Sequence, residues 1–310
     1  MRPVLLAPAT IVEACPGCHR PTSDSATLGT ANGFVVATST RQFTQPPYEI
    51  RQCQRCGLMY RTPRPAQTEL DAYYRSDAFD NFENAELFPT ERVVREILNR
   101  LPRGARVLDF GCNTGRLMAS FVGHFECFGI ELNPAAADVA RRRGVCVTAL
   151  AELASAAGTF DAVVTIDVFE HLTKPMPVLA ALRDLLKRGG ALIIVTGNGD
   201  APVCRTAPAE FWYFRALGHV LMLTRAFASY LATALDLRLV SWVEMSHYDV
   251  SYPAAFVQRL KSWAYWSFRR RTLIARLLLR HIPRLRRARN WENAPPITAL
   301  SDHVVAMLER

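Results

Sequence analysis

The sequence predicts an α/β fold in which helices cover both faces of a mostly parallel β-sheet, preceded by a small β-rich metal-binding module. Three observations support this prediction. Strand-like and helix-like runs alternate with short connections from about residue 90 onward, which is typical of a parallel sheet. A strand-like run at 106–110 leads into a glycine-punctuated turn. Two C-x-x-C pairs lie in the first fifth of the chain.

Length and composition bound the class of the protein. The 310 residues correspond to about two domains at roughly 150 residues each, and half of them are apolar. Charged residues make up 21%, which excludes a disordered, collagen-like or coiled-coil chain. No run approaches the roughly 18 apolar residues of a membrane-spanning helix. The apolar run before Pro8 is too short for a signal peptide, so we expect a cytoplasmic protein.

The net charge of +9 comes from one segment. Residues 251–290 contain eleven basic side chains and no acidic one, whereas 26 basic and 28 acidic residues lie outside them. This distribution argues against a chain that binds polyanions over its whole surface. Apolar side chains, among them Trp263 and Trp266, lie between the arginines of 254–282, so the pattern predicts a basic amphipathic helix that ends at Pro283.

This basic segment has three interpretations. A basic amphipathic helix with tryptophans is typical of a peripheral contact with an anionic membrane, here through residues 254–289. The same arginines could instead form a basic patch that binds RNA, which is a polyanion. The third interpretation is a helix that packs on its own domain and keeps its arginines in water.

Four of the eight cysteines have the spacing of a zinc site and form two C-x-x-C pairs, which are Cys15, Cys18, Cys53 and Cys56. Pro16 and Gly17 lie inside the first pair and Gly57 follows the second, so a tight turn can direct both thiolates of each pair toward one ion. Four thiolates leave no open coordination position, so the expected Zn²⁺ is structural. In a cytosolic chain a metal is favoured over disulfides; the alternative is two unrelated pairs.

The segments between these motifs have their own patterns. β-favouring runs at 33–37 and 48–52 between turn residues fit a zinc ribbon, and Pro63 with Pro65 is expected to close it. The predicted parts of the chain are a zinc-ribbon-like module at 1–65, a linker or lid at 66–88 and the main domain at 89–310. The expected strands of the main domain are 106–110, 127–131, 145–148, 160–166, 191–196, 237–245 and 302–308. The expected helices are 90–101, 115–122, 134–143, 151–156, 177–186 and 224–234.

The turn after the first main strand carries the strongest chemical signal. Its sequence is Asp109-Phe-Gly111-Cys-Asn113-Thr-Gly115, and such a turn lets backbone amides approach a ligand closely. A dinucleotide-binding turn would need a third glycine where Arg116 stands. The acid inside the motif favours a cationic ligand over a phosphate.

With these residues the sequence resembles the class I S-adenosylmethionine (SAM)-dependent methyltransferases. The first motif of that family is an acid followed by three alternating glycines, and Asn113 is the one departure; asparagine tolerates positive φ well. Glu131 lies 22 residues after Asp109, where the family has a carboxylate that binds ribose. Residues 160–172 look like its fourth-strand motif, and 185–195 look like the start of its fifth strand.

The resemblance implies a Rossmann-like seven-stranded sheet of order 3-2-1-4-5-7-6 with the last strand antiparallel. The basic segment would then belong to a helical insertion at 251–300, before the last strand. The resemblance also implies SAM as the cofactor, with adenine flanked by Ala149 and Leu150. The expected donor-binding residues are Asp109, Gly111, Cys112, Asn113, Gly115, Glu131, Leu132, Ala149, Leu150, Asp167 and Val168.

The resemblance extends to the substrate half of the chain. Residues 53–60 and 69–74 are similar to bacterial methyltransferases with an N-terminal zinc module, among them sugar C- and O-methyltransferases. A small-molecule or glycan acceptor is therefore expected. The candidate acceptor contacts are Tyr73, Tyr74, Trp212, Tyr213 and His219.

Glu170 and His171 are the best candidates for a catalytic base. They follow the expected fourth strand at its carboxyl end, and a turn there would place both on the face of Asp167. For His171 a general base and an orienting hydrogen bond are both open, and for Glu170 a structural role is favoured. His219 is a second, weaker candidate.

The predicted function is SAM-dependent methyl transfer to a hydroxyl or carbon of a small-molecule acceptor, such as a sugar, nucleotide sugar or glycan. One alternative is an RNA methyltransferase that uses the zinc module and the basic segment, although nucleic acid is not the expected partner. Another is a catalytically silent SAM-binding module, suggested only by Asn113. The acceptor and the oligomeric state stay open.

Overall fold

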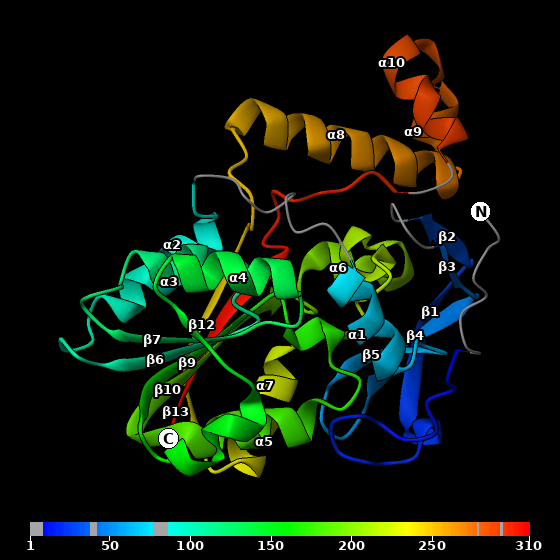
Figure 1. The fold of residues 1–310 in the computed structure, drawn as a ribbon. Coiled ribbons are helices and arrows are strands. Elements are labelled where there is room, and N and C mark those ends of the chain that lie inside the picture. Colours follow the sequence, from blue (N-terminus) through cyan, green and yellow to red (C-terminus); the bar gives the residue numbers. More distant parts are fainter. Residues whose placement is uncertain (1–8, 38–41, 77–85, 278, 292–293) are drawn as a thin grey trace.

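A computed structural model describes residues 9–37, 42–76, 86–277, 279–291 and 294–310, and a seven-stranded sheet forms the centre of these residues (Figure 1). Its strands are β6 (Arg106–Phe110), β7 (Glu126–Ile130), β8 (Cys146–Val147), β9 (Phe160–Ile166), β10 (Leu186–Gly197), β12 (Arg238–Met245) and β13 (His303–Glu309). Their order is β12-β13-β10-β9-β6-β7-β8. β13 is antiparallel to both of its neighbours, and the other pairs are parallel. The predicted fold class and strand order are confirmed.

Helices cover both faces of this sheet (Figure 1). They are α2 (Pro89–Leu98), α3 (Arg116–Ala119), α4 (Pro134–Arg142), α5 (Pro175–Leu185) and α7 (Arg225–Ala234). Successive residues of a strand point to opposite faces, so the central strands contribute to two apolar cores. Leu108 and Val163 pack on the side of α5 and α7. Val107 and Val164 pack on the side of α2, α3 and α4.

A second sheet joins the N-terminal part of the chain to the main domain. It consists of β1 (Ser25–Ala31), β4 (Tyr48–Cys53), β5 (Met59–Thr62) and β11 (Leu221–Met222), in the order β1-β4-β5-β11. β2 (Phe34–Ala37) pairs with β3 (Gln42–Gln45) in a separate hairpin. β11 lies between β10 and α7 in the chain, so its pairing with β5 connects the two parts through backbone hydrogen bonds. The turn before β5 is also fixed to α7, because the Thr224 hydroxyl donates to the Gly57 carbonyl at 2.9 Å.

Arg61 on β5 strengthens this connection from inside. Its side chain is fully buried and donates to the backbone carbonyls of Phe214 at 3.3 Å, Ala216 at 3.2 Å and Leu217. Burial lowers the pKa of Arg61 to about 10. Carbonyl oxygens thus stabilise the buried guanidinium in place of a carboxylate, and they fix the loop that follows Trp212 and Tyr213.

Several elements are shorter than predicted. The helix expected at 115–122 is the single turn α3, and the third strand is only β8. α1 (Gln67–Ser76) lies in the expected linker or lid, of which residues 77–85 fall outside the described part of the chain. The other short elements are α6 (Pro202–Thr206) and the 3₁₀ helices Thr22–Asp24, Leu150–Ala156, Phe169–His171, Pro208–Glu210, Trp212–Arg215, Leu279–His281 and Arg287–Asn290.

The basic segment is not one helix. It forms α8 (Tyr252–Arg269), α9 (Leu273–Leu277) and α10 (Pro283–Arg286). The chain turns after α8 because Arg271 adopts a positive φ of 50°. Pro283 begins α10 instead of ending a helix, since proline fits the first helical turn. Among the described residues, no helix is both long and apolar enough to cross a bilayer.

Candidate active site

The turn between β6 and α3 depends on three residues with positive φ. Gly111, Asn113 and Gly115 have φ values of 87°, 47° and 70°. A Cβ atom at Gly111 would lie 2.4 Å from Val168 Cγ2, so a larger residue does not fit there. Asparagine tolerates the left-handed region, and Asn113 therefore takes the place of the middle glycine without changing the course of the turn.

Glu131 connects this turn to the end of β7. Its Oε2 accepts the backbone N–H of Asn113 at 2.9 Å, and its Oε1 accepts that of Asn133 at 2.7 Å. Each carboxylate oxygen can accept two hydrogen bonds, so both keep a lone pair for a ligand. The Asn133 side chain caps the N-terminus of α4, which fixes this end of the cradle.

Three carboxyl groups make the turn electronegative. Asp109 is 4% exposed, and burial, followed by the charges of Glu91 and Glu131, raises its pKa to about 7. Arg116 forms an ion pair with Glu91 and partly offsets this charge. The site therefore favours a positively charged ligand.

Glu170 lies in the 3₁₀ turn that follows β9 and is fully buried. Its Oε2 accepts the Thr196 hydroxyl at 2.7 Å, and its Oε1 accepts the hydroxyl of Tyr213. Burial raises the pKa of Glu170. The two hydrogen bonds hold the carboxylate inside the fold, so Glu170 can support a neighbouring group but does not face a substrate.

His171 is positioned by groups from two other segments and by the neighbouring Glu170. Its Nδ1 lies 2.6 Å from the Tyr74 hydroxyl and 3.1 Å from the Gly218 carbonyl oxygen, and its Nε2 lies 3.8 Å from Glu170 Oε1. The ring centroid of His219 lies 4.9 Å away. Burial and the charge of His171 hold the pKa of His219 well below its ordinary value, so this second imidazole is neutral. The structure brings all these predicted residues together.

Two histidines that the sequence did not indicate lie at the same edge of the sheet. His247 follows β12, and His303 is the first residue of β13. Because β13 runs antiparallel, its first residue lies at the carboxyl edge of the parallel strands, so the strand order could have indicated His303. Burial raises the pKa of Asp167, but the contact with His303 and the charge of His247 outweigh it and hold the pKa below its ordinary value.

Aromatic rings surround these polar groups. The Tyr213 hydroxyl lies 3.1 Å from Asp167 Oδ1, and its ring centroid lies 4.8 Å from that of His303. Trp212 lies 6.4 Å from Tyr248, ring to ring. The Trp212 Nε1 atom is buried and has no hydrogen-bond partner within the described ranges. Such rings, with one unpaired donor, suit a ligand that has both a flat face and polar substituents.

The other predicted contacts lie around the same edge. Cys112 is buried behind the turn, and Leu132, the residue after Glu131, is 43% exposed. Leu150 begins the 3₁₀ helix that follows β8, and Ala149 is the N-cap residue of that helix. Tyr73 lies on α1, where its ring packs edge-on against that of the next tyrosine. The hydrogen bonds and ion pairs described above for the histidines and carboxylates do not include the side chains of Cys112, Leu132, Ala149 and Leu150.

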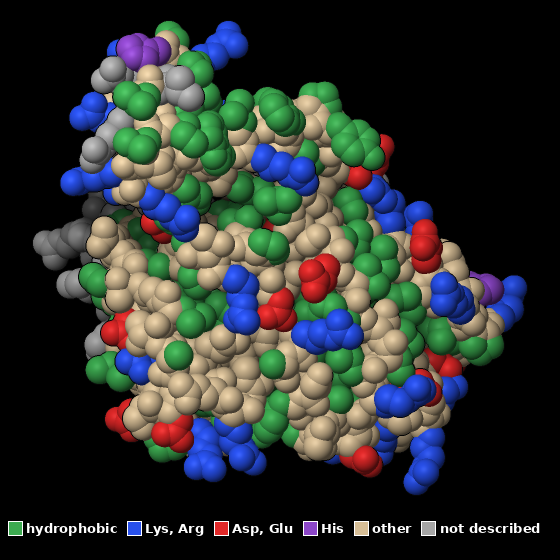
Figure 2. Space-filling model, turned by 180° about the vertical axis from the view of Figure 1, so that it is seen from behind, with side chains coloured by type: hydrophobic (Ala, Val, Ile, Leu, Met, Phe, Trp, Pro, Cys, Tyr) green, Lys and Arg blue, Asp and Glu red, His purple; other side chains and the backbone are tan. Residues whose placement is uncertain are grey.

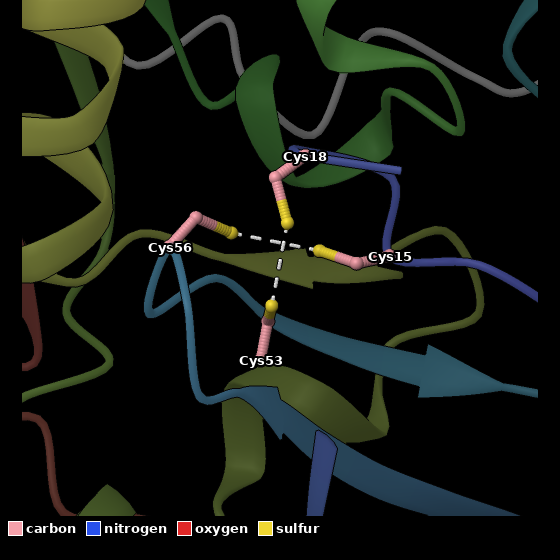
Figure 3. Close-up of side chains that lie close together, drawn as sticks. All are labelled: Cys15, Cys18, Cys53 and Cys56. Atoms are coloured by element: carbon pink, nitrogen blue, oxygen red, sulfur yellow. Dashed lines mark hydrogen bonds between the residues drawn. The ribbon is translucent and has the colours of Figure 1, made fainter. Parts of the chain in front are cut away.

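The four predicted zinc ligands form one cluster (Figure 3). The sulfurs of Cys15 and Cys56 are 3.5 Å apart, as are those of Cys18 and Cys53, and all four lie within 4.8 Å of one another. Tetrahedral Zn–S bonds of about 2.3 Å would place sulfurs about 3.8 Å apart. The hydrogen bond with Cys56 lowers the pKa of Cys15 to about 5. The cluster is therefore consistent with a zinc module.

Sequence relatives match about a third of the chain. A ubiquinone biosynthesis O-methyltransferase of Xanthomonas axonopodis pv. citri is 36% identical over 107 residues, which are 31% of this chain and 45% of that protein. A protein of the same name from Cereibacter sphaeroides is 33% identical over 114 residues, or 34% of this chain and 46% of that protein. The chain thus spans about half the length of the curated relatives it matches.

Solved structures share the fold at low sequence identity. The Haloferax volcanii complex of the Trm112 methyltransferase activator and a methyltransferase gives a TM-score of 0.52 at 14% identity, covering 78% of this chain and 97% of that one. A geranyl diphosphate methyltransferase bound to GPP and sinefungin gives 0.50 at 15% identity, covering 79% and 98%.

The family model for a methyltransferase domain matches residues 82–294, which is more than half of the chain. The matched region contains the glycine turn, Glu131 and the Glu170–His171 turn, in the order that the resemblance implied. The strand order and the acid-and-glycine turn agree with this match. The chain belongs to the class I SAM-dependent methyltransferases.

Proposed function

We propose that SAM binds across the Gly111–Gly115 turn, with its ribose on Glu131 and its methionine end beside Asp167 and Val168. The buried Oδ1 of Asn113 has no hydrogen-bond partner in the described part of the chain, so a polar group of the ligand can supply one. The carboxyl groups around the turn suit the positive charges of SAM. When bound, SAM supplies a methyl group that its positively charged sulfur activates.

The Glu131→Gln variant tests this donor site. Glutamine keeps one acceptor oxygen but directs an NH₂ group toward a backbone N–H, and it lacks the charge that strengthens bonds to ribose. Losing charged hydrogen bonds costs about 1.5–3 kcal/mol, so Kd for SAM should rise roughly 10- to 100-fold in calorimetry. Glu126→Gln, at the exposed start of β7, is the matched control and should bind normally. An unchanged Kd for Glu131→Gln would contradict the proposal.

The proposed acceptor is a hydroxyl group of a small molecule of the sugar, nucleotide sugar or glycan class. The observation that carries this proposal is the half-buried ring of Trp212, whose buried Nε1 has no hydrogen-bond partner among the described residues, at the same edge of the sheet as His171. Aromatic faces pack against sugar rings while polar groups bind hydroxyls. The relatives' names support oxygen over carbon, since they are O-methyltransferases.

His171 is the proposed base. If its Nδ1 carries the proton and donates it to the Gly218 carbonyl, its Nε2 has the lone pair that accepts the hydroxyl proton. Glu170, 3.8 Å away, would stabilise the resulting imidazolium. Tyr74, whose hydroxyl lies 2.6 Å from Nδ1, helps to hold the ring and is a positioning residue.

Methyl transfer from labelled SAM identifies the acceptor class. Nucleotide sugars, glycan extracts, catechols and RNA are each incubated with the full chain, and the products are examined by mass spectrometry. We expect the label on a sugar hydroxyl. Label on RNA would favour an RNA methyltransferase that uses the basic segment. Label on a catechol would indicate a phenolic hydroxyl as the acceptor. Either result would contradict a sugar acceptor.

The cluster of Cys15, Cys18, Cys53 and Cys56 is proposed to hold one structural Zn²⁺. All four positions of a tetrahedral ion would be taken by thiolates, so the ion would have no place for a substrate. Its role would be to hold β4 and β5 in place. Because β5 pairs with β11, the ion would also help to hold the loop before β11, which contains Trp212 and Tyr213.

The basic segment is proposed to contact an anionic membrane. Large apolar side chains stand exposed on it, among them Tyr252 (95%), Phe256 (66%), Leu273 (71%) and Leu277 (60%). Figure 2 shows hydrophobic and basic side chains together on the projection that α8–α10 form. Exposed apolar groups beside arginines fit lipid better than RNA, which would bind the charges alone.

Cosedimentation with vesicles tests this contact. Phe256→Asp should lower the partitioning into phosphatidylserine-containing vesicles at least about tenfold. The change removes an apolar side chain that would be buried in the lipid on binding, and it adds a negative charge. Ile11→Asp, at a similarly exposed apolar position of the N-terminal part, should bind like the wild type. Equal binding to neutral vesicles, or binding to RNA that Phe256→Asp leaves intact, would contradict the proposal.

A further inference from the structure

A three-residue cluster at the carboxyl edge of the sheet contains two histidines that have no role in the methyl transfer described above. It consists of Asp167, His247 and His303, which come from the ends of β9, β12 and β13. One ligand atom from each lies within 4.8 Å of the others. His303 Nε2 is 3.5 Å from Asp167 Oδ1, and His247 Nε2 is 3.9 Å from Asp167 Oδ2.

These distances fit a shared ion better than direct hydrogen bonds. Hydrogen bonds between imidazole and carboxylate are shorter than about 3.2 Å, and both contacts exceed that length. Two ligands bound to one ion at about 2.0–2.2 Å lie roughly 3–4 Å apart. Both histidines are almost fully buried, with 5% of the surface of His247 and 1% of that of His303 exposed. Bulk water therefore does not solvate their ring nitrogens in place of an ion.

The groups behind the two imidazoles direct Nε2 toward the carboxylate. His247 Nδ1 lies 3.1 Å from the buried hydroxyl of Thr90, and His303 Nδ1 lies 3.3 Å from Asp302 Oδ1. Asp302 also accepts the backbone N–H of His247 at 3.1 Å. If His247 Nδ1 donates to Thr90 and the proton of His303 lies on the Nδ1 that faces Asp302, each Nε2 keeps a lone pair that faces Asp167. Metal-binding histidines typically have such partners on the other ring nitrogen.

A neighbouring cluster, Glu170 with His171 and His219, has similar spacing but a different environment. Both oxygens of Glu170 already accept hydrogen bonds, from Thr196 and Tyr213. Hydrogen bonds therefore occupy both oxygens of that carboxylate, whereas Asp167 accepts the Tyr213 hydroxyl at Oδ1 and is partly exposed.

We propose that Asp167, His247 and His303 bind one divalent first-row transition-metal ion. Two imidazoles and one carboxylate leave positions open on such an ion. This inference rests on the proposed function, because the open positions would face the acceptor beside Trp212 and Tyr213. A bound hydroxyl would have a lowered pKa, which eases transfer of its proton to a base.

Cobalt titration of the zinc-loaded full chain tests the site without measuring activity. We expect one Co²⁺ per chain, with visible d–d bands and without a thiolate-to-cobalt charge-transfer band, which separates this site from the cysteine cluster. His303→Gln and Asp167→Asn should each weaken binding at least about 100-fold. His124→Gln, at an exposed histidine outside the cluster, should not change the affinity for Co²⁺.

A second kind of variant covers the case in which a ligand variant fails to fold. Thr90→Val removes only the hydroxyl behind His247 and should weaken Co²⁺ about 10- to 100-fold. The proposal is overturned if the wild type binds no Co²⁺ beyond the cysteine site, or if both ligand variants bind normally. It is also overturned if His219→Gln abolishes binding while His303→Gln does not. Failure to methylate sugars would contradict the proposed acceptor and leave this readout unaffected.

Discussion

The His171→Gln variant is expected to lower kcat by about 100- to 10,000-fold, the range that a positioned base contributes. Glutamine can fill the space and still donate to the Gly218 carbonyl, but it cannot take a proton from a hydroxyl group. Because the donor cradle is made by other residues, Kd for SAM should stay within about twofold. Single-turnover methyl transfer with the acceptor found in the labelling assay measures the first quantity, and calorimetry the second.

Two control variants separate a base from an orienting residue. Tyr74→Phe removes the hydroxyl 2.6 Å from His171 Nδ1 and should lower kcat by about tenfold, because the imidazole keeps its lone pair but loses one of the contacts that orient it. His171→Gln should lower kcat much further, since no imidazole is left to take the proton. A His171→Gln enzyme with a rate near the wild type, or one no slower than Tyr74→Phe, would leave His171 with a structural role only.

The donor half of the site could be predicted from the sequence because its parts are local. Gly111, Asn113 and Gly115 lie in one turn, and the requirement for positive φ is set by the backbone of that turn alone. Glu131 follows the next strand, and parallel strands bring their carboxyl ends to one edge. Residue type and spacing therefore contain nearly all of the information about this half.

The other half depends on contacts between distant segments. His303 reaches the edge because the last strand is antiparallel, and His247 precedes the whole basic insertion in the chain. Arg61 fixes the loop after Tyr213 through carbonyl oxygens, which no sequence pattern marks. Likewise, hydrophobic spacing suggested a helix over 254–282, but periodicity does not show that the chain turns at Arg271.

Loss of the proposed zinc is expected to destabilise the fold well beyond the four cysteines. Cys53→Ser should reduce bound zinc from one to near zero per chain and lower the free energy of unfolding by about 4 kcal/mol or more, since the loss of a metal is among the most damaging changes. The four sulfurs belong to the same apolar core as Leu58 and Phe227, so loosening of the cluster spreads to α7.

The same change should weaken the acceptor side more than the donor side. β5 carries both the pairing with β11 and the buried Arg61, so a loosened ribbon releases the loop with Trp212 and Tyr213, whereas the Gly111–Gly115 turn rests on the main sheet. KM for the acceptor should therefore rise at least about tenfold while Kd for SAM changes little. Cys204→Ser, an equally buried cysteine outside the cluster, controls for the loss of a buried thiol. Metal analysis that finds no zinc in the wild type, or equal melting temperatures for the two variants, would contradict a structural ion.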